Sequence, residues 1–345
     1  MIPVSEGKTA LDKIIKKTRV HLYKPIQIAE ILFKQRSGEI DDLADLESYR
    51  SASKHWRDAI TVPFIGAKCS SSAKFQDDVF SETAMPPRLL VGLGEINKRS
   101  GAVEAYIYQA FKDKYFQLNE ALNYCLEATP LTFDLKVFLG MFWAEAGLKR
   151  SLDKIFEIVV YALFEVIVTN SGLKIALRID GDGSVLKEFH EFAQKVLGLH
   201  SDLAFEEVDA HFHRVGITNA ADRGLDMYAN FGSVVQIKHL DLNETLAGDI
   251  VSSVASDRIV IVCKQVDAEL VTKVLNQLGF SHRIQAIVSV EELIEWYSRA
   301  LTGVNSCMLA DRLIETLGEQ IQLEFPSLGG DDFDDFCRGR GYKLG

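Results

Sequence analysis

The sequence predicts a mixed α/β fold in which a helical N-terminal region precedes a sheet flanked by helices. Up to about residue 150, apolar residues recur at helical spacing between Pro and Gly breakers. Beyond that point, short runs rich in β-branched residues alternate with helical patterns. Because strands and helices alternate in this second part, we expect its strands to form one sheet with helices packed on it.

The composition is that of an ordinary globular protein. Hydrophobic residues make up 47% of the 345 residues, and charged residues make up 25%. The formal net charge of −11 argues against a protein that coats DNA phosphates non-specifically. It does not exclude a nuclease, because clustered acids that bind Mg²⁺ repel DNA only until the metal arrives.

The cysteine pattern and the apolar segments indicate a protein of a reducing cytoplasm. The five cysteines are scattered and contain no CxxC pair, so neither a disulfide framework nor a zinc site is expected. Lysines interrupt the apolar residues at the N-terminus, which argues against a signal peptide. The most apolar helix, Ile155–Val168, is too short to span a bilayer, so no membrane partner is expected.

Helical spacing predicts most of the N-terminal region. We expect a helix over residues 8–36 with an interruption before Pro25, a second helix over 41–58, and further helices from Arg88 to Gly147. Aromatic residues at helical spacing in the last stretch are expected to lie in the core and not on a base-stacking surface. They are Tyr106, Tyr108, Phe111, Tyr115, Phe116, Phe138, Phe142 and Trp143.

A breaker-rich segment of this region contains two candidate DNA contacts. Lys68, three consecutive serines and Lys74 lie around the start of a predicted helix. Hydroxyls and backbone amides at a helix start suit anion binding, so one interpretation is a phosphate contact. A serine that caps the helix without any ligand is the other interpretation.

The apolar helix Ile155–Val168 carries two glutamates. Glu157 and Glu165 are eight residues apart and therefore lie near one stripe of the helix. A carboxylate on such a helix is costly unless it is paired or bound to a metal. The residues alone leave open whether Glu157 serves a site or pairs with a Lys or Arg of a neighbouring element.

The stretch Ala221–His239 predicts a β-hairpin. Apolar and β-branched residues form two candidate strands, Leu225–Ala229 and Val234–His239, on either side of an Asn-Phe-Gly-Ser breaker. In the second strand the period of two puts Gln236 and Lys238 on the same face.

The loop of this hairpin decides what faces that pair of side chains. We predict an odd loop, Phe231–Ser233, which places Tyr228 opposite Gln236 and Asp226 opposite Lys238. An acid, an amide and an amine would then share one face. A surface ribbon with an Asp226–Lys238 ion pair explains the same pattern without any chemistry.

Basic residues lie just before the hairpin. His213, Arg214 and Arg223 are candidates for contacts with phosphates or with guanine edges in the major groove. They could equally neutralise Glu206, Glu207 or Asp222, so both interpretations stand.

The remaining elements complete the predicted sheet. Residues 173–179 favour a strand that ends in an Asp-Gly-Asp-Gly turn, and 185–197 favour an amphipathic helix. Strands are expected at 258–263 and 286–288 with a helix at 268–278 between them, which is typical of a parallel crossover and makes the sheet mixed. Helices follow at 291–301 and 308–317. The tail from Gly329, acidic and then basic, is expected to be disordered or to serve as an interaction segment.

Asp226, nine further positions and then Gln236-Ile237-Lys238 resemble the metal-dependent nuclease motif PD-(D/E)XK, in the variant where Gln replaces the second acid. Longer segments extend the resemblance over most of the chain, which is similar to the HaeII family of type II restriction endonucleases. These segments are Leu11–Leu32, Ser71–Phe80, Val103–Phe111 and Ala221–Gly232.

The resemblance implies a division of the chain and a substrate. Residues 1–150 would form the helical region for DNA recognition or dimerisation, 151–300 the nuclease core, and 301–345 a C-terminal helix and charged tail. A homodimer would hydrolyse double-stranded DNA at a short palindrome, Pu-GCGC-Py in the namesake of the family. Other nucleases with this core, such as repair or junction-resolving enzymes, and a DNA-binding protein without catalysis are the alternatives.

The resemblance also implies roles for single residues. Asp226 would be the principal Mg²⁺ ligand and Gln236 a neutral ligand through its side-chain oxygen. Lys238 would orient the attacking water or stabilise the pentavalent phosphorus. Since Gln removes one negative charge from the site, a further acid is expected, and Glu157 on the first core helix is the candidate ligand.

Overall fold

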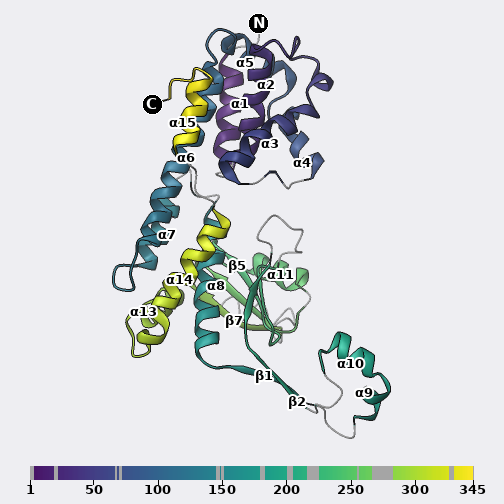
Figure 1. Ribbon diagram of the computed structural model, residues 1–345, viewed down its shortest axis with the longest axis vertical. Coiled ribbons are helices and arrows are strands. Elements are labelled where there is room, and N and C mark those ends of the chain that lie inside the picture. Colours follow the sequence, from purple (N-terminus) through teal and green to yellow (C-terminus); the bar gives the residue numbers. More distant parts are fainter. Residues whose placement is uncertain are drawn as a thin grey trace. The chain divides into compact units, whose positions relative to one another are not determined.

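The computed structural model divides the chain into two compact units (Figure 1). Unit 1 contains residues up to Ile158 and those from Leu317 onwards, and unit 2 contains most of the chain from Val159 to Thr316. The structure describes residues 4–18, 22–66, 68–69, 72–144, 148, 151–178, 183–199, 205–215, 225–254, 256–265, 283–325 and 330–344.

Unit 1 is helical, as the sequence predicts. In its centre α2 packs against α3, α5 and α6, and α1 packs against α2 and α5. The helices are α1 (Val4–Lys17), α2 (Tyr23–Arg36), α3 (Ala52–Ile65), α4 (Ala73–Asp77), α5 (Pro87–Asn97), α6 (Ala102–Leu126), α7 (Leu135–Ala144), the first part of α8 (Leu152–Asn170), and α15 (Gly330–Gly339). Two short 3₁₀ turns, η1 (Leu46–Ser48) and η2 (Asp78–Phe80), lie between them.

The helix breaks follow the local chemistry of the sequence. The predicted interruption before Pro25 is confirmed, because Leu22 precedes α2 in the left-handed region at φ 42°. Pro25 then lies in the first turn of α2, where its missing N–H costs no hydrogen bond. The helical pattern predicted from Arg88 begins one residue earlier, because α5 starts at Pro87.

The predicted helix over residues 41–58 is wrong in its first half. Only the 3₁₀ turn η1 forms there, and α3 begins at Ala52. The buried Tyr49 explains the difference, because its hydroxyl donates a hydrogen bond to the carbonyl of Leu43 at 2.8 Å and folds the chain back at this point. The apolar residues of this stretch therefore pack around a turn.

The aromatic residues of α6 and α7 lie mainly in the core of unit 1. Tyr108, Phe111, Tyr115, Phe138 and Phe142 are buried, which confirms the prediction for them. The prediction is wrong for two others, because Tyr106 is 42% exposed and Phe116 is 65% exposed.

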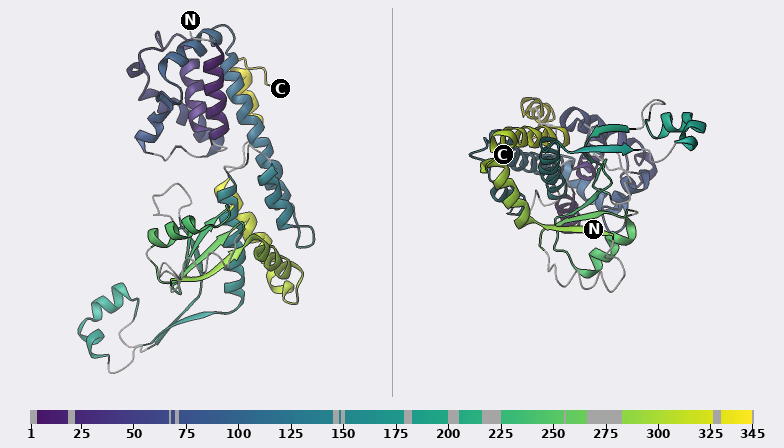
Figure 2. Two further views of the ribbon diagram at one scale, coloured as in Figure 1. Left: turned by 180° about the vertical axis from the view of Figure 1, so that it is seen from behind. Right: turned by 90° about the horizontal axis from the view of Figure 1, so that it is seen from below.

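The C-terminal tail is ordered, which corrects one of the two expectations for it. It forms α15, which runs alongside α6 in both Figure 1 and Figure 2. The ring of Phe333 packs on Phe111 at 5.3 Å, and that of Phe336 packs on Tyr108 at 5.2 Å. Alternating acidic and aromatic residues in this tail therefore make one apolar helix face with a charged face behind it.

Unit 2 is built on a five-stranded sheet in the order β3-β4-β5-β6-β7. The strands β3, β4 and β5 are antiparallel neighbours, whereas β5, β6 and β7 are parallel, so the predicted mixed sheet is confirmed. The strands are β3 (Phe212–Arg214), β4 (Met227–Ala229), β5 (Val234–Lys238), β6 (Ile259–Cys263) and β7 (Ile284–Ser289). Helix α11 (Glu244–Ser253) connects β5 with β6, and the helix predicted at 268–278 lies outside the described residues.

Helices cover parts of both faces of this sheet. On one face α8 contributes Phe164, whose ring packs on Phe212 of β3 at 5.5 Å. On the other face Ala247, Ile250 and Val251 of α11 form a core cluster with residues of β6. Residues of β5 alternate between these two faces, because side chains of a strand alternate. Val235 and Ile237 therefore point away from the face of Gln236 and Lys238.

Unit 2 also contains a separate, two-stranded sheet. Strands β1 (Lys174–Arg178) and β2 (Phe205–Asp209) are antiparallel, and β1 confirms the strand predicted at 173–179. The amphipathic helix predicted at 185–197 forms instead two short helices, α9 (Ser184–Glu188) and α10 (His190–Val196). Phe189 separates them with φ −102° and ψ 41°, outside the helical region.

Two further helices end the described part of unit 2 and lead back to unit 1. Helix α13 (Val290–Thr302) begins with a capping box formed by Ser289 and Glu292, and α14 (Ser306–Glu324) follows it. The hydroxyl of Tyr297 donates to the carbonyl of Val159, which fixes α13 to α8. Among the described residues, no helix has the length and apolar character needed to cross a membrane.

Candidate active site

The predicted hairpin forms, with a loop of the predicted odd length but one residue earlier. The Ala229 amide donates to the Ser233 carbonyl at 2.7 Å, so the loop is Asn230–Gly232, with Gly232 at φ 99°. Tyr228 therefore lies opposite Val234 and not opposite Gln236, which corrects the predicted register. By the same register Asp226 falls at the level of Gln236, and the three candidate side chains still start from one face.

The hairpin brings Asp226 and Lys238 together. The Lys238 ammonium lies 3.5 Å from Oδ2 of Asp226. The same oxygen accepts a hydrogen bond from the Ile237 amide at 2.7 Å. Because β4 begins only at Met227, the carboxylate takes the place of a strand carbonyl beside β5. Asp226 is thus fixed by the backbone of the motif itself, with 14% of its side chain exposed against 30% for Lys238.

Gln236 occupies the inner position of the site. It is 2% exposed, since the face it shares with Val234 is partly covered by the core cluster of α11. A buried amide is satisfied only by partners of fixed geometry. Burial therefore restricts the conformations of this side chain more than those of a surface glutamine.

The metal expected from the resemblance fits the donors of this face. Mg²⁺ is typically held by one or two carboxylates, with waters and substrate phosphates completing its shell. Asp226 supplies one carboxylate, and the neutral amide of Gln236 lies at the same level of the hairpin. Within the described residues no group of three His, Cys, Asp or Glu side chains is placed to hold a metal.

The two glutamates of α8 have different partners. Glu157 is buried in unit 1, and its carboxylate pairs with Lys154 of its own helix at 2.7 Å. Glu165 lies in unit 2 and holds the start of β3, with Oε1 2.8 Å from His211 Nδ1 and Oε2 accepting from the Phe212 amide at 2.7 Å. The sequence indicated a paired acid on this helix but not that Glu165 anchors the sheet.

The predicted DNA contacts His213 and Arg214 lie on opposite faces of the sheet. His213 is exposed on β3 opposite Tyr228, and so shares the face of Asp226. Arg214 pairs with the buried Met227 and therefore points to the opposite face, although it lies next in the sequence. Arg223 lies outside the described residues.

Lys68 and Lys74 lie in unit 1, beside the start of α4. Ser72 caps this five-residue helix, and its hydroxyl accepts from the Phe75 amide at 3.3 Å. The capping interpretation is thus confirmed for Ser72, while the predicted phosphate contact of the two lysines stays a prediction.

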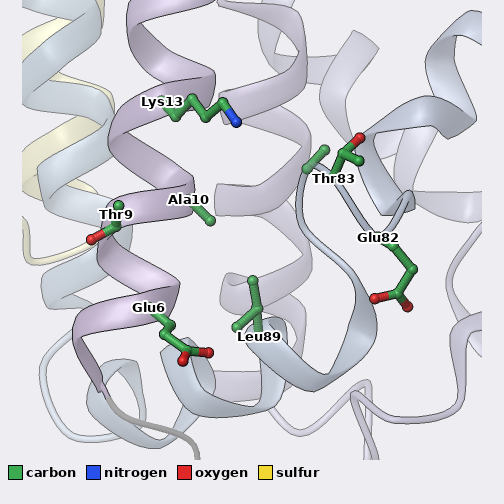
Figure 3. Close-up of a pocket in the computed structure, with 8 residues that line it drawn as sticks. Glu6, Thr9, Ala10, Lys13, Glu82, Thr83 and Leu89 are labelled. Carbon is green, nitrogen blue, oxygen red and sulfur yellow. The ribbon is translucent and has the colours of Figure 1, made fainter.

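One pocket of unit 1 is unrelated to these candidates. It has a volume of about 300 Å³ and lies between α1 and the segment before α5 (Figure 3). Its charged lining consists of Glu6, Lys13 and Glu82. With two carboxylates against one ammonium, it is not suited to a phosphate.

Comparison with known proteins identifies the family of the chain. The model of the HaeII restriction endonuclease family matches residues 7–342. The chain is 48% identical to type II restriction enzyme HaeII of Haemophilus aegyptius, over 99% of this chain and 98% of that protein. It is 46% identical to type II restriction enzyme NgoBI of Neisseria gonorrhoeae, over 98% of this chain and 97% of the relative. No solved structure matches the chain.

A helix, three antiparallel strands, a crossover helix and a parallel strand, with an acid just before the second strand and Gln-x-Lys on the third, define a nuclease-like core. The protein is a type II restriction endonuclease. The chain belongs to the HaeII restriction endonuclease family, which confirms the resemblance of its sequence.

Proposed function

We propose that the protein hydrolyses phosphodiester bonds of double-stranded DNA at a short palindrome in a Mg²⁺-dependent reaction of the PD-(D/E)XK type. The observation that supports this most directly is the hairpin, in which Lys238 lies 3.5 Å from Asp226 while Gln236 shares their face. A surface ion pair would explain the contact between two of these residues. It would not explain a buried amide beside them.

In this proposal each side chain of the hairpin has one task. Asp226 and Gln236 hold Mg²⁺, which when bound polarises the phosphoryl oxygen and lowers the pKa of a bound water. The Ile237 amide holds the Asp226 carboxylate in its orientation. Lys238, with 30% of its side chain exposed, orients the attacking water and stabilises the negative charge that develops on the phosphate.

Glu157 is proposed as the acid that compensates for Gln236. Its carboxylate is buried and lies 2.7 Å from the Lys154 ammonium of the same helix. Glu165 is the less suitable acid of the two, because both of its oxygens hold β3.

The substrate and the assembly are proposed from the family. The recognition site would be Pu-GCGC-Py or a close relative of it, and two copies would bind it as a homodimer, because two-fold DNA sites are matched by two-fold proteins. His213, Arg214, Arg223, Lys68 and Lys74 are proposed to contact the DNA. Residues 1–150 would contribute to recognition or dimerisation.

Cleavage of plasmid DNA tests the proposal. Purified protein is incubated with a plasmid that contains one Pu-GCGC-Py site, in Mg²⁺ and in EDTA. Linear product with ends inside the site, formed only in Mg²⁺, is the expected result. Cutting confined to branched DNA would favour a junction-resolving enzyme, and retardation of the plasmid without cutting would contradict the proposed hydrolysis.

A further inference from the structure

Two neighbouring aromatic rings, those of His213 and Tyr228, lie on the same face of the sheet as Asp226. Neither takes part in the proposed chemistry. His213 of β3 and Tyr228 of β4 are cross-strand partners. Their ring centroids are 5.0 Å apart, with an interplanar angle of 32°. Tyr228 is 42% exposed and His213 is also exposed, so both rings lie at the surface of the sheet.

The pair lies directly beside the candidate site. Tyr228 is two residues from Asp226 along the chain, which places it on the same face at about 7 Å along the strand. On β5 the order is Val234, Gln236 and Lys238, with Tyr228 opposite Val234. Asp226 and Gln236 therefore lie between Lys238 on one side and the ring pair on the other.

The polar atoms of the two rings differ from those around them. Neighbouring polar side chains of this region are used in the fold: His211 contacts Glu165, Asn230 donates to the Asp209 carbonyl, and Arg258 contacts Gln285. Among the described residues, neither the Tyr228 hydroxyl nor the His213 imidazole has a hydrogen-bond partner. Side chains stand roughly perpendicular to a sheet, so their polar ends extend toward solvent.

A ring pair with outward polar ends suits an anion better than a base. Each ring covers one face of the other, so a base stacked between them would have to separate them. A tyrosine hydroxyl and an imidazole N–H are both common donors to DNA phosphates.

We propose that Tyr228 and His213 form a second phosphate subsite, which binds the phosphate next to the scissile one on the same DNA strand. This inference rests on the proposed function and assigns the ligand of a neighbouring position. By fixing two consecutive phosphates, the face would set the register of the strand over Asp226. Tyr228 and His213 are therefore positioning residues that act on binding more than on the chemical step.

The test compares DNA affinity with the rate of cleavage for Tyr228→Phe. This variant keeps the ring and its packing on His213 but removes the hydroxyl. Loss of one hydrogen bond to a charged group is expected to raise the Kd for a cognate duplex in Ca²⁺ roughly tenfold. The single-turnover rate at saturating DNA should change by less than about threefold, since no group at the reacting phosphate is lost.

A neutral phosphate identifies the ligand. Replacing the adjacent phosphate by a methylphosphonate should weaken binding by wild type, and should weaken binding by Tyr228→Phe much less, because the two changes remove the same contact. Equal losses for both proteins, or an unchanged Kd for Tyr228→Phe, would overturn the subsite. His213→Leu should show the same pattern as Tyr228→Phe.

Different results would contradict the proposed hydrolysis and the phosphate subsite. If Lys238→Ala and Asp226→Asn still cut DNA, the proposed function is wrong and the subsite falls with it. If both variants are inactive while Tyr228→Phe binds every duplex like wild type, only the subsite is wrong. Thermal unfolding of each variant excludes a folding defect as the cause.

Discussion

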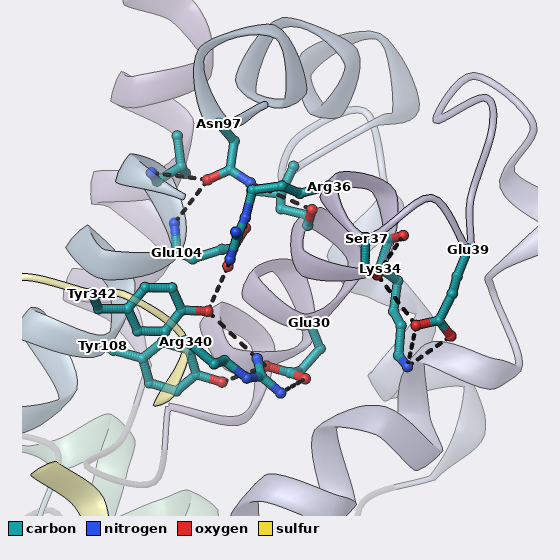
Figure 4. A network of polar contacts seen from close by, with 12 residues as sticks. Glu30, Lys34, Arg36, Ser37, Glu39, Asn97, Glu104, Tyr108, Arg340 and Tyr342 are labelled. Carbon is teal, nitrogen blue, oxygen red and sulfur yellow. Dashed lines mark hydrogen bonds and ion pairs between the residues drawn. The ribbon is translucent and has the colours of Figure 1, made fainter. Parts of the chain in front are cut away.

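The Arg340 guanidinium forms two charged hydrogen bonds with the Glu30 carboxylate, at 2.6 Å and 2.9 Å, across 310 residues of sequence. The Tyr108 hydroxyl donates to the same carboxylate, and the Tyr342 hydroxyl donates to Glu104 (Figure 4). Both carboxylates are buried. The tail thus supplies the cation for Glu30 through Arg340. For Glu104, which pairs with Arg36, it supplies a hydrogen bond through Tyr342.

Replacing Arg340 should destabilise unit 1 strongly. Arg340→Met keeps much of the side-chain volume but leaves Glu30 buried without its cation, which typically costs about 3–5 kcal/mol. Urea unfolding followed by circular dichroism measures the change. Arg338→Met is the matched control, because Arg338 is 74% exposed on the same turn of chain and should change stability little. Equal midpoints for the two variants would show that the Glu30 contact does not stabilise the fold.

The same network predicts a loss of stability in alkaline solution. Burial, more than any other cause, raises the pKa of Tyr342 above its usual range. The folded state therefore retains the proton when the unfolded state already loses it near pH 10. The corresponding stability is complete below about pH 10 and is lost as the pH rises toward the folded pKa. Melting temperatures of wild type and Tyr342→Phe between pH 8 and 11 should converge as the pH rises, and parallel curves would contradict this assignment.

These contacts show which part of the fold the sequence can predict. Periodicity identified most helices of unit 1 and the alternation of strands and helices that makes the sheet mixed, because each of these depends on residues close in the sequence. It did not place the tail, whose aspartates and arginines resemble a disordered segment. The tail is ordered by its contacts with Glu30 and Glu104, and the burial of these two residues depends on how distant helices pack.

The hairpin shows the same limit on a smaller scale. The odd loop followed from the need to keep Asp226 and Lys238 on one face, and it is confirmed. The register was wrong by one pair, because the Ala229–Ser233 pair closes the loop early while the Ser233 hydroxyl contacts Gln285 of β7 at 3.1 Å. Gln285, 52 positions from Ser233, therefore favours the loop Asn230–Gly232 over the loop Phe231–Ser233, although the local sequence allows both.

Removing the Lys238 ammonium should impair cleavage and leave the fold intact. In Lys238→Ala the loss of one preorganised group at the developing charge is expected to lower the single-turnover rate roughly 10²–10³-fold. Unfolding should be nearly unchanged, because the ammonium is partly exposed and bound to one carboxylate. Lys264→Ala, at a more exposed lysine just after β6, is the control and should cut like wild type. Undiminished cleavage by Lys238→Ala would remove this residue from the mechanism.

Gln236 should tolerate Glu better than Leu. Gln236→Glu restores a carboxylate at the position where most nucleases of this type carry one, so cleavage in Mg²⁺ should persist, whereas Gln236→Leu removes the oxygen ligand and should be inactive. Since the side chain is 2% exposed, the new charge is costly without a counterion. Gln236→Glu should therefore melt below wild type in EDTA and recover in Mg²⁺. Activity of Gln236→Leu equal to wild type would show that Gln236 is not a ligand.

Metal should govern DNA binding as well as cleavage. The chain has a net charge of −11 and a carboxylate at the phosphate position, so the metal-free site should repel DNA over a Debye length of about 8–10 Å in physiological salt. A divalent cation held by Asp226 and Gln236 reverses the local sign. Ca²⁺, which commonly fills such sites without supporting hydrolysis, should therefore tighten specific binding by wild type.

The substitution Asp226→Asn separates charge from structure in this effect. Asparagine retains an oxygen that can accept from the Ile237 amide, so the hairpin should be preserved while the repelling charge is lost. Metal-free binding should become tighter than in wild type, and Ca²⁺ should add little. Asp241→Asn removes the same charge from a side chain that is 66% exposed just beyond β5, and should leave both affinities nearly unchanged. If Ca²⁺ does not alter wild-type affinity, and Asp226→Asn binds as weakly as wild type in EDTA, then Asp226 does not face the phosphate.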